Sequence, residues 1–136
     1  DVVSLHARLA PETAGMIDAR ALAAMKPTAV VVNTARGELV DEPALIAALQ
    51  SGALAGAALD TFATEPLPAA SMLRRLPNVI LSPHVAGQTG DAMVRVGLAA
   101  AQAILDELAG RRPACVVNPA AYAVRRRAGT AAAAAP

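Results

Sequence analysis

Three side chains in this sequence have the types that acid–base chemistry on an anionic molecule requires: Arg36, Glu65 and His84. An arginine holds a carboxylate through two parallel hydrogen bonds. A histidine exchanges protons near neutral pH, and a neighbouring carboxylate orients its ring. Taken singly, the arginine is also typical of a solvated surface charge and the histidine of a loop residue. A joint site therefore depends on a fold that brings the three together.

Four short apolar runs are the elements that could position these side chains. The runs are continuous rather than alternating, which is typical of parallel strands covered on both faces. They span residues 2–5, 29–33, 56–60 and 79–82. Arg36, Glu65 and His84 each follow one of the last three runs. Because ligands bind beyond the carboxyl ends of parallel strands, the sequence predicts that the three residues converge at one edge of a sheet.

Helical segments with readable ends lie between the predicted strands. Asp18 is a candidate cap for a helix that stops before Pro27, and Asp41 starts another that ends at Gly52. The alternation of strand and helix predicts an α/β fold with a parallel sheet. A longer helix is expected from residue 88 or 89 to 108, with Gly110 after it. Its polar residues form one narrow stripe, so most of its circumference is expected to be buried.

Composition excludes several classes of partner. The net charge of +1, with 17% charged residues, gives no electrostatic case for nucleic-acid binding. No apolar stretch approaches the roughly 18 to 20 residues that span a bilayer, so the expectation is a cytoplasmic protein without a membrane partner. Cys115 is the single cysteine, which excludes an internal disulfide, and no metal site is expected.

Several sequence blocks, in unbroken order over about residues 1–120, resemble the signature blocks of the D-isomer-specific 2-hydroxyacid dehydrogenases. The blocks are Val-Asn-Thr-Ala-Arg-Gly at 32–37, Val-Asp-Glu at 40–42, Gly-Ala-Ala-Leu-Asp at 56–60, Glu-Pro-Leu-Pro at 65–68, Leu-Pro-Asn-Val at 76–79 and Ser-Pro-His-Val-Ala-Gly at 82–87.

The resemblance implies a catalytic role for each of the three residues. Arg36 would bind the substrate carboxylate, and Glu65 would be hydrogen-bonded to His84. His84 would be the general acid–base, which protonates the carbonyl oxygen of a 2-keto acid as hydride arrives from NADH, or takes the hydroxyl proton in reverse. The implied substrate is a small 2-hydroxy or 2-keto acid, and the implied whole protein is a homodimer.

The same resemblance implies NAD as the cofactor and assigns residues to its binding. The residues expected at the cofactor are Thr34, Ala35, Arg36, Asp60, His84, Ala86 and Gly87. Asp60 has a second interpretation, as a cap at the end of its strand. NADP is not excluded, because the residue that discriminates the two cofactors belongs to a part of the family's fold that this sequence does not contain.

One large feature of the family is absent from the 136 residues. The Gly-x-Gly-x-x-Gly fingerprint, which cradles the dinucleotide pyrophosphate, does not occur. The expected architecture is therefore an incomplete doubly wound parallel sheet, the second half of a Rossmann-like NAD-binding domain. The expected organisation is residues 1–109 in that half, 110–121 as a return segment towards a substrate domain, and 122–136 as a disordered tail.

Two other functions remain open on the sequence. An NADH-sensing, dehydrogenase-like binding protein of the corepressor type can retain the same arginine, glutamate and histidine. An inactive fragment is the third interpretation, and the isolated 136-residue chain is expected to be inactive. The particular 2-hydroxy acid cannot be named, because much of the family's substrate site lies outside this sequence.

Overall fold

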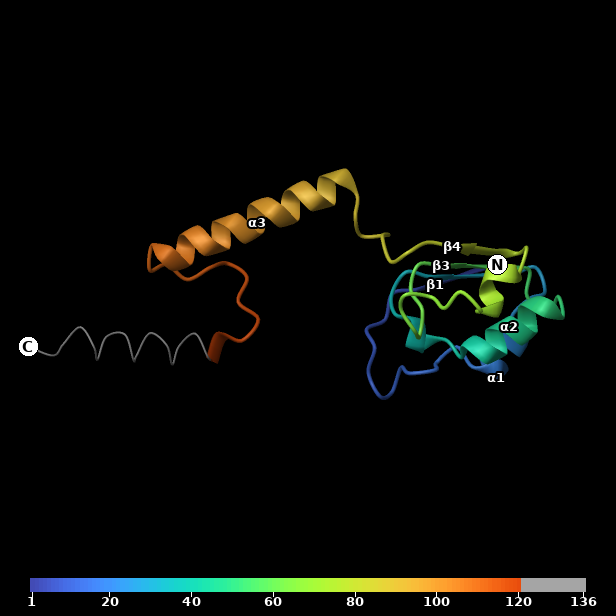
Figure 1. Ribbon diagram of the computed structural model, residues 1–136. Helices are drawn as coiled ribbons and strands as arrows, with labels where there is room; N and C mark the ends of the chain where they lie inside the picture. The colour runs from blue at the N-terminus through green and yellow to red at the C-terminus, as the bar shows by residue number, and fades with distance from the viewer. Residues whose placement is uncertain (121–136) are drawn as a thin grey trace, which may run out of the picture. The chain divides into compact units, whose positions relative to one another are not determined.

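The computed structural model describes residues 1–120 and contains a four-stranded parallel sheet (Figure 1). The strands are β1 (Val2–Leu5), β2 (Val30–Asn33), β3 (Gly56–Leu59) and β4 (Val79–Leu81), and they lie in the order β1-β2-β3-β4. All four predicted strands are confirmed, with ends that differ by at most one residue. The α/β fold class is also confirmed.

The strand register aligns the carboxyl ends of the sheet. Leu5 is paired with Asn33, Asn33 with Leu59, and Leu59 with Leu81. These four residues are the last of their strands. The loops that follow the strands therefore all leave the sheet at one edge.

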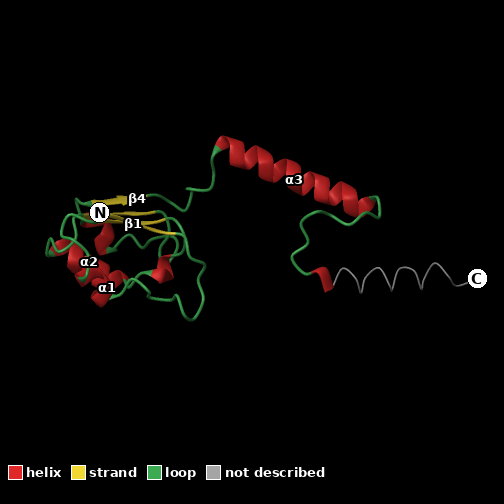
Figure 2. Ribbon diagram, turned by 180° about the vertical axis from the view of Figure 1, so that it is seen from behind, coloured by secondary structure: helices red, strands yellow, loops and turns green. Residues whose placement is uncertain are grey.

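Two helices connect the first three strands and lie on the same face of the sheet (Figures 1 and 2). They are α1 (Ala19–Ala23) and α2 (Glu42–Gln50). The predicted caps are confirmed: the carboxylate of Asp18 accepts a hydrogen bond from the amide of Ala21, and that of Asp41 accepts one from the amide of Ala44. Two 3-10 helices, Gly37–Leu39 and Met72–Arg75, complete the connections.

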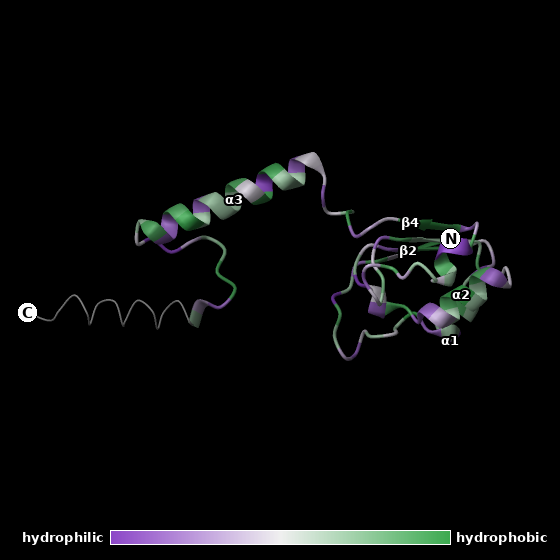
Figure 3. Cartoon of the chain, in the orientation of Figure 1, coloured by the Kyte–Doolittle hydropathy of each residue, from purple (hydrophilic) through white to green (hydrophobic). Residues whose placement is uncertain are grey.

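The hydrophobic core lies between the sheet and these helices. Val31, Ala57 and Leu59 point into it and are at most 5% exposed. The prediction that the strands are covered on both faces is wrong within residues 1–88, because both helices cover the same face. On the other face Val2 is 67% exposed and Ile80 is 73% exposed, and Figure 3 shows the hydrophobic character of β4.

The chain divides into two compact units, residues 1–88 and the residues from Thr89 onward. The second unit contains α3 (Gly90–Leu108), which begins where the Thr89 hydroxyl accepts a hydrogen bond from the amide of Ala92. Gly110 follows the helix with a φ of 69°, as expected for a helix C-terminus. The predicted domain boundary at 109 and the return segment stay predictions, and the predicted tail at 122–136 lies outside the described residues.

The expected burial of α3 is not met. None of its residues is buried, although apolar side chains such as Val96, Leu98 and Leu108 lie along it. The physical reason is that the described residues of its own unit, 89–120, include no sheet on which the helix could pack.

Gly37 is expected to be indispensable for packing the loop that carries Glu65. A Cβ at Gly37 would overlap the backbone of Phe62 and Ala63. Gly37→Ala should therefore cost about 1–3 kcal/mol of unfolding free energy, measured by urea unfolding of the chain. Gly87→Ala is the matched control, because no atom lies within 4 Å of a Cβ there. Equal midpoints for the two variants would contradict the prediction.

Candidate active site

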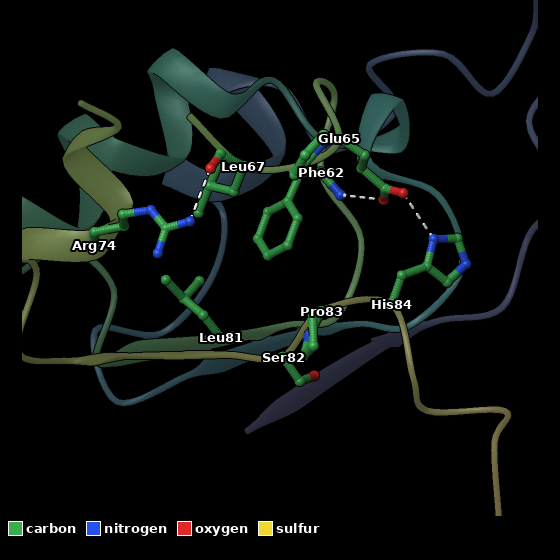
Figure 4. Close-up of a pocket in the computed structure, with 9 residues that line it drawn as sticks. Phe62, Glu65, Leu67, Arg74, Leu81, Ser82, Pro83 and His84 are labelled. Atoms are coloured by element: carbon green, nitrogen blue, oxygen red, sulfur yellow. Dashed lines mark hydrogen bonds and ion pairs between the residues drawn. The ribbon is translucent and has the colours of Figure 1, made fainter. Parts of the chain in front are cut away.

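The predicted contact between Glu65 and His84 is present at the carboxyl edge of the sheet (Figure 4). His84 Nδ1 lies 2.9 Å from Glu65 Oε2. The other carboxylate oxygen accepts a hydrogen bond of 3.0 Å from the backbone amide of Phe62. The carboxylate is therefore fixed on one side by its own loop and orients the imidazole on the other. Nε2 lies on the opposite side of the ring, away from this contact.

The surroundings of Glu65 favour its ionised form. The hydrogen bond with His84 is the largest cause that lowers the pKa of Glu65, followed by the hydrogen bond from the Phe62 amide. Slight desolvation opposes this, while the charges of His84 and Arg36 lower the pKa further. The resulting arrangement, an ionised carboxylate against an imidazole, is the one that acid–base chemistry uses.

The titration of Glu65 should report the contact with His84 directly. In the 136-residue chain the Cδ resonance of Glu65 is expected to titrate below the usual range for glutamate. In His84→Ala the pKa of Glu65 should move up, because the largest cause of its depression is gone. Because the pKa of Glu65 is lower in the folded state, its ionised carboxylate stabilises the fold at pH values above its pKa in the unfolded state. That stabilisation is lost as the pH falls through its pKa in the folded state. An identical midpoint in both proteins would contradict the pairing.

Arg36 lies in the turn after β2, and Asn33 fixes the backbone of that turn. The Asn33 amide group donates to the carbonyl of Arg36 at 2.8 Å, and its oxygen accepts from the amide of Ala35 at 3.0 Å. Asn33 itself is only 1% exposed. The guanidinium of Arg36 is exposed and donates to the carbonyl of Ala35. Sequence reasoning missed the role of Asn33, although a polar residue ending a buried strand was a signal for it.

Asp60 directly follows β3, and its side chain is held by the segment that carries His84. Its carboxylate accepts hydrogen bonds from the Ser82 hydroxyl and from the amides of Val85 and Ala86. These contacts fit the strand-end cap more directly than a cofactor contact. The sequence did not reveal the partners of Asp60.

The other predicted cofactor residues lie in the loops at the same edge. Thr34, Ala86 and Gly87 are exposed, and Ala35 is half-buried. A Cβ at Gly87 would meet no atom within 4 Å. The carboxyl edge is therefore open at these residues, as the binding of a flat ring there would require.

A pocket of about 520 Å³ opens beside the Glu65–His84 pair. Its other walls include Phe62, Leu67 and Leu81, and Arg74 (Figure 4). The Arg74 guanidinium donates to the carbonyls of Leu67 at 2.8 Å and Pro68 at 3.1 Å. Arg74 thus holds the loop behind Glu65, a contact that no sequence pattern indicated.

Other kinds of site are not found in the part of the chain that the structure describes. Residues 1–120 hold no cluster of three or more metal-ligating side chains. Within the same residues, every helix is too short or too polar to cross a membrane.

An open parallel sheet whose polar side chains gather beyond the carboxyl ends of the strands is typical of doubly wound, Rossmann-like domains. Comparisons with known proteins agree with that class. The sequence model of the D-isomer specific 2-hydroxyacid dehydrogenase NAD binding domain matches residues 1–86. The chain belongs to this family.

Individual relatives agree with the family. The chain is 46% identical over 118 residues, 87% of its length, to D-3-phosphoglycerate dehydrogenase of Synechocystis, and 44% identical over 92% of its length to glyoxylate reductase of Thermofilum pendens. Its fold matches a crystal structure of D-lactate dehydrogenase with NAD+ from Lactobacillus jensenii, with a TM-score of 0.78, 34% identity and coverage of 86% of this chain and 39% of that one. The chain spans only 21% and 37% of the length of the two sequence relatives.

Proposed function

We propose that this chain forms the carboxyl-terminal half of the NAD-binding domain of a 2-hydroxyacid dehydrogenase and carries its acid–base pair. The observation that carries the proposal is the 2.9 Å contact between His84 Nδ1 and Glu65 Oε2, at the edge where loops leave a parallel sheet. Family membership supports the same chemistry. The substrate class is a small 2-keto or 2-hydroxy acid.

Each of the three predicted catalytic residues has a distinct task in this proposal. His84 protonates the carbonyl oxygen of a 2-keto acid through Nε2 and takes the hydroxyl proton in the opposite direction. Glu65 holds the ring through Nδ1 and stabilises its charged form. Arg36 binds the substrate carboxylate through its exposed guanidinium. When bound, NADH supplies the hydride.

The chain would hold only one end of that cofactor. Thr34, Ala35 and the segment at Ala86 and Gly87 would border the nicotinamide. The sequence contains no Gly-x-Gly-x-x-Gly fingerprint, so the pyrophosphate site is not among these 136 residues. Cofactor binding and turnover are accordingly assigned to the whole protein.

Steady-state turnover by the whole protein tests the proposal. NADH oxidation is expected with small 2-keto acids such as glyoxylate and pyruvate. Ketones of the same size without a carboxylate should react poorly, because they leave Arg36 without its partner. NADH binding with no turnover of any 2-keto acid would overturn the proposal and favour a dehydrogenase-like binding protein.

The 136-residue chain alone is expected to bind NADH weakly. Without the glycine-rich turn and the helix N-terminus behind it, the pyrophosphate has no anchor. The expected dissociation constant is millimolar, which corresponds to about 4 kcal/mol at a 1 M standard state. Calorimetric titration measures it. Stoichiometric micromolar binding would contradict this description of the cofactor site.

A further inference from the structure

We propose that Asp60 is the positioning residue for His84, holding the segment Ser82–Ala86 so that the imidazole faces Glu65. This inference rests on the proposed role of His84. It adds Asp60, which affects the reaction by holding the backbone around His84. Asp60 does not touch the ring in this arrangement. The hydrogen bonds of its carboxylate all come from Ser82, Val85 and Ala86, on either side of His84.

Four hydrogen bonds tie Asp60 to that segment. Oδ1 accepts from the Ser82 hydroxyl at 2.5 Å and from the Val85 amide at 2.9 Å. Oδ2 accepts from the Ala86 amide at 2.9 Å. The carbonyl of Asp60 accepts from the His84 amide at 2.8 Å. Asp60, directly after β3, therefore forms hydrogen bonds with residues on both sides of His84 and with the backbone amide of His84 itself.

The backbone of His84 is in a conformation that needs such support. Its φ of 56° lies in the left-handed region, which a side chain with a Cβ adopts rarely. Among residues 1–120, His84 is the only residue other than glycine with a positive φ. A conformation of this kind persists when surrounding contacts determine it, and such residues gather at functional sites. The contacts that determine it here come from Asp60.

The Asp60 side chain must be ionised to accept its three hydrogen bonds. Asp60 is 3% exposed, and all three groups that face its carboxylate donate a proton. Burial acts to raise the pKa of Asp60, but the hydrogen bonds from Ser82 and the two amides outweigh it and lower the pKa. Asparagine has nearly the same shape, yet it would turn a donating NH2 group towards one of these donors. Asp60→Asn is therefore a sharp test.

The experiment records the imidazole nitrogen resonances of the isotopically labelled 136-residue chain. The sequence has two histidines, so a His6→Gln sample assigns the ring signals. Glu65→Gln provides the reference for a ring whose carboxylate partner is lost. Asp41→Asn is the matched control, because asparagine caps a helix as well as aspartate does. Circular dichroism determines whether each variant is folded.

In folded Asp60→Asn, the His84 ring signals are expected to shift towards those of Glu65→Gln. The amides of Val85 and Ala86 should exchange at least about tenfold faster than in the parent chain. Asp41→Asn should match the parent in both measurements. His84 signals at the parent position in folded Asp60→Asn would overturn the proposal. If Asp60→Asn does not fold, the same ring signals are recorded for Ser82→Ala. The His84 signals of this variant are expected to shift in the same direction by a smaller amount. Signals at the parent position would overturn the proposal.

The imidazole resonances test the role of Asp60 independently of the proposed function. The ring signals need neither NADH nor turnover, so a whole protein without dehydrogenase activity would leave the positioning result standing. If the whole protein is active, Asp60→Asn should lower kcat with little change in the KM for the 2-keto acid, since Arg36 is untouched. A rise in KM with unchanged kcat would contradict positioning of His84.

Discussion

Replacing His84 by alanine in the whole protein is expected to lower kcat for 2-keto acid reduction by about 10²–10⁴-fold, the range typical of a lost general acid. Nε2 is the proton donor in the proposed reaction. The other histidine of this sequence, His6, follows β1, where its ring is hydrogen-bonded to Ser4. The KM for the keto acid should change little, because Arg36 still binds its carboxylate. Initial rates of NADH oxidation measure both quantities.

Two further measurements separate lost chemistry from lost structure in this variant. His84→Asn tolerates a left-handed backbone better than alanine does, so a similar loss of kcat in both variants indicates that the ring itself matters. Added imidazole should restore part of the rate to His84→Ala, because it supplies the missing proton donor. A kcat within about threefold of the parent would remove His84 from the acid–base role.

The meeting of Glu65 and His84 was predictable because of a general property of parallel sheets. Once the runs at 56–60 and 79–82 are recognised as parallel strands, the loops after them must leave at one edge. The helix starts were predictable for a local reason, since Asp18 and Asp41 cap helices through their own side chains. The helix starts needed only the rules of one element, whereas the shared edge needed the rule for parallel strands, and the hydrogen bond between Glu65 and His84 was implied by the family resemblance.

The support behind these residues could not be predicted in the same way. The hydrogen bonds of Asp60 depend on where the Val85 and Ala86 amides point, and the left-handed backbone of His84 sets that direction. The contact between Phe62 and Glu65 likewise depends on the path of a loop. Sequence patterns report side-chain type and spacing, and loop amide directions follow from the folded backbone.

The burial of exposed apolar faces was mispredicted for another reason. The patterns of β4 and α3 indicate surfaces suited to burial, but they do not say what covers them. Ile80 is 73% exposed and Leu108 is 79% exposed. A hydrophobic pattern shows that a face is suited to burial, but its burial also requires a second surface that covers it.

Arg36 is expected to determine how tightly the whole protein binds its keto acid. Losing a two-fold, charge-assisted contact costs about 3 kcal/mol, so Arg36→Ala should lower kcat/KM by roughly 100-fold, mainly through KM. The backbone of its turn is held by Asn33 rather than by the arginine side chain, so the substitution should remove the guanidinium without moving the turn. Steady-state kinetics over a range of 2-keto acid concentrations measure the effect.

Lysine at this position distinguishes charge from geometry. Arg36→Lys keeps the charge but lacks the planar pair of donors that matches a carboxylate, so its kcat/KM should lie between those of the parent and Arg36→Ala. Arg20→Ala, which removes an exposed arginine from α1, is the matched control and should leave the kinetics unchanged. Ketones without a carboxylate should react equally poorly with the parent and with Arg36→Ala, because neither protein makes the contact with them. A parent-like KM in Arg36→Ala would show that the carboxylate is bound elsewhere.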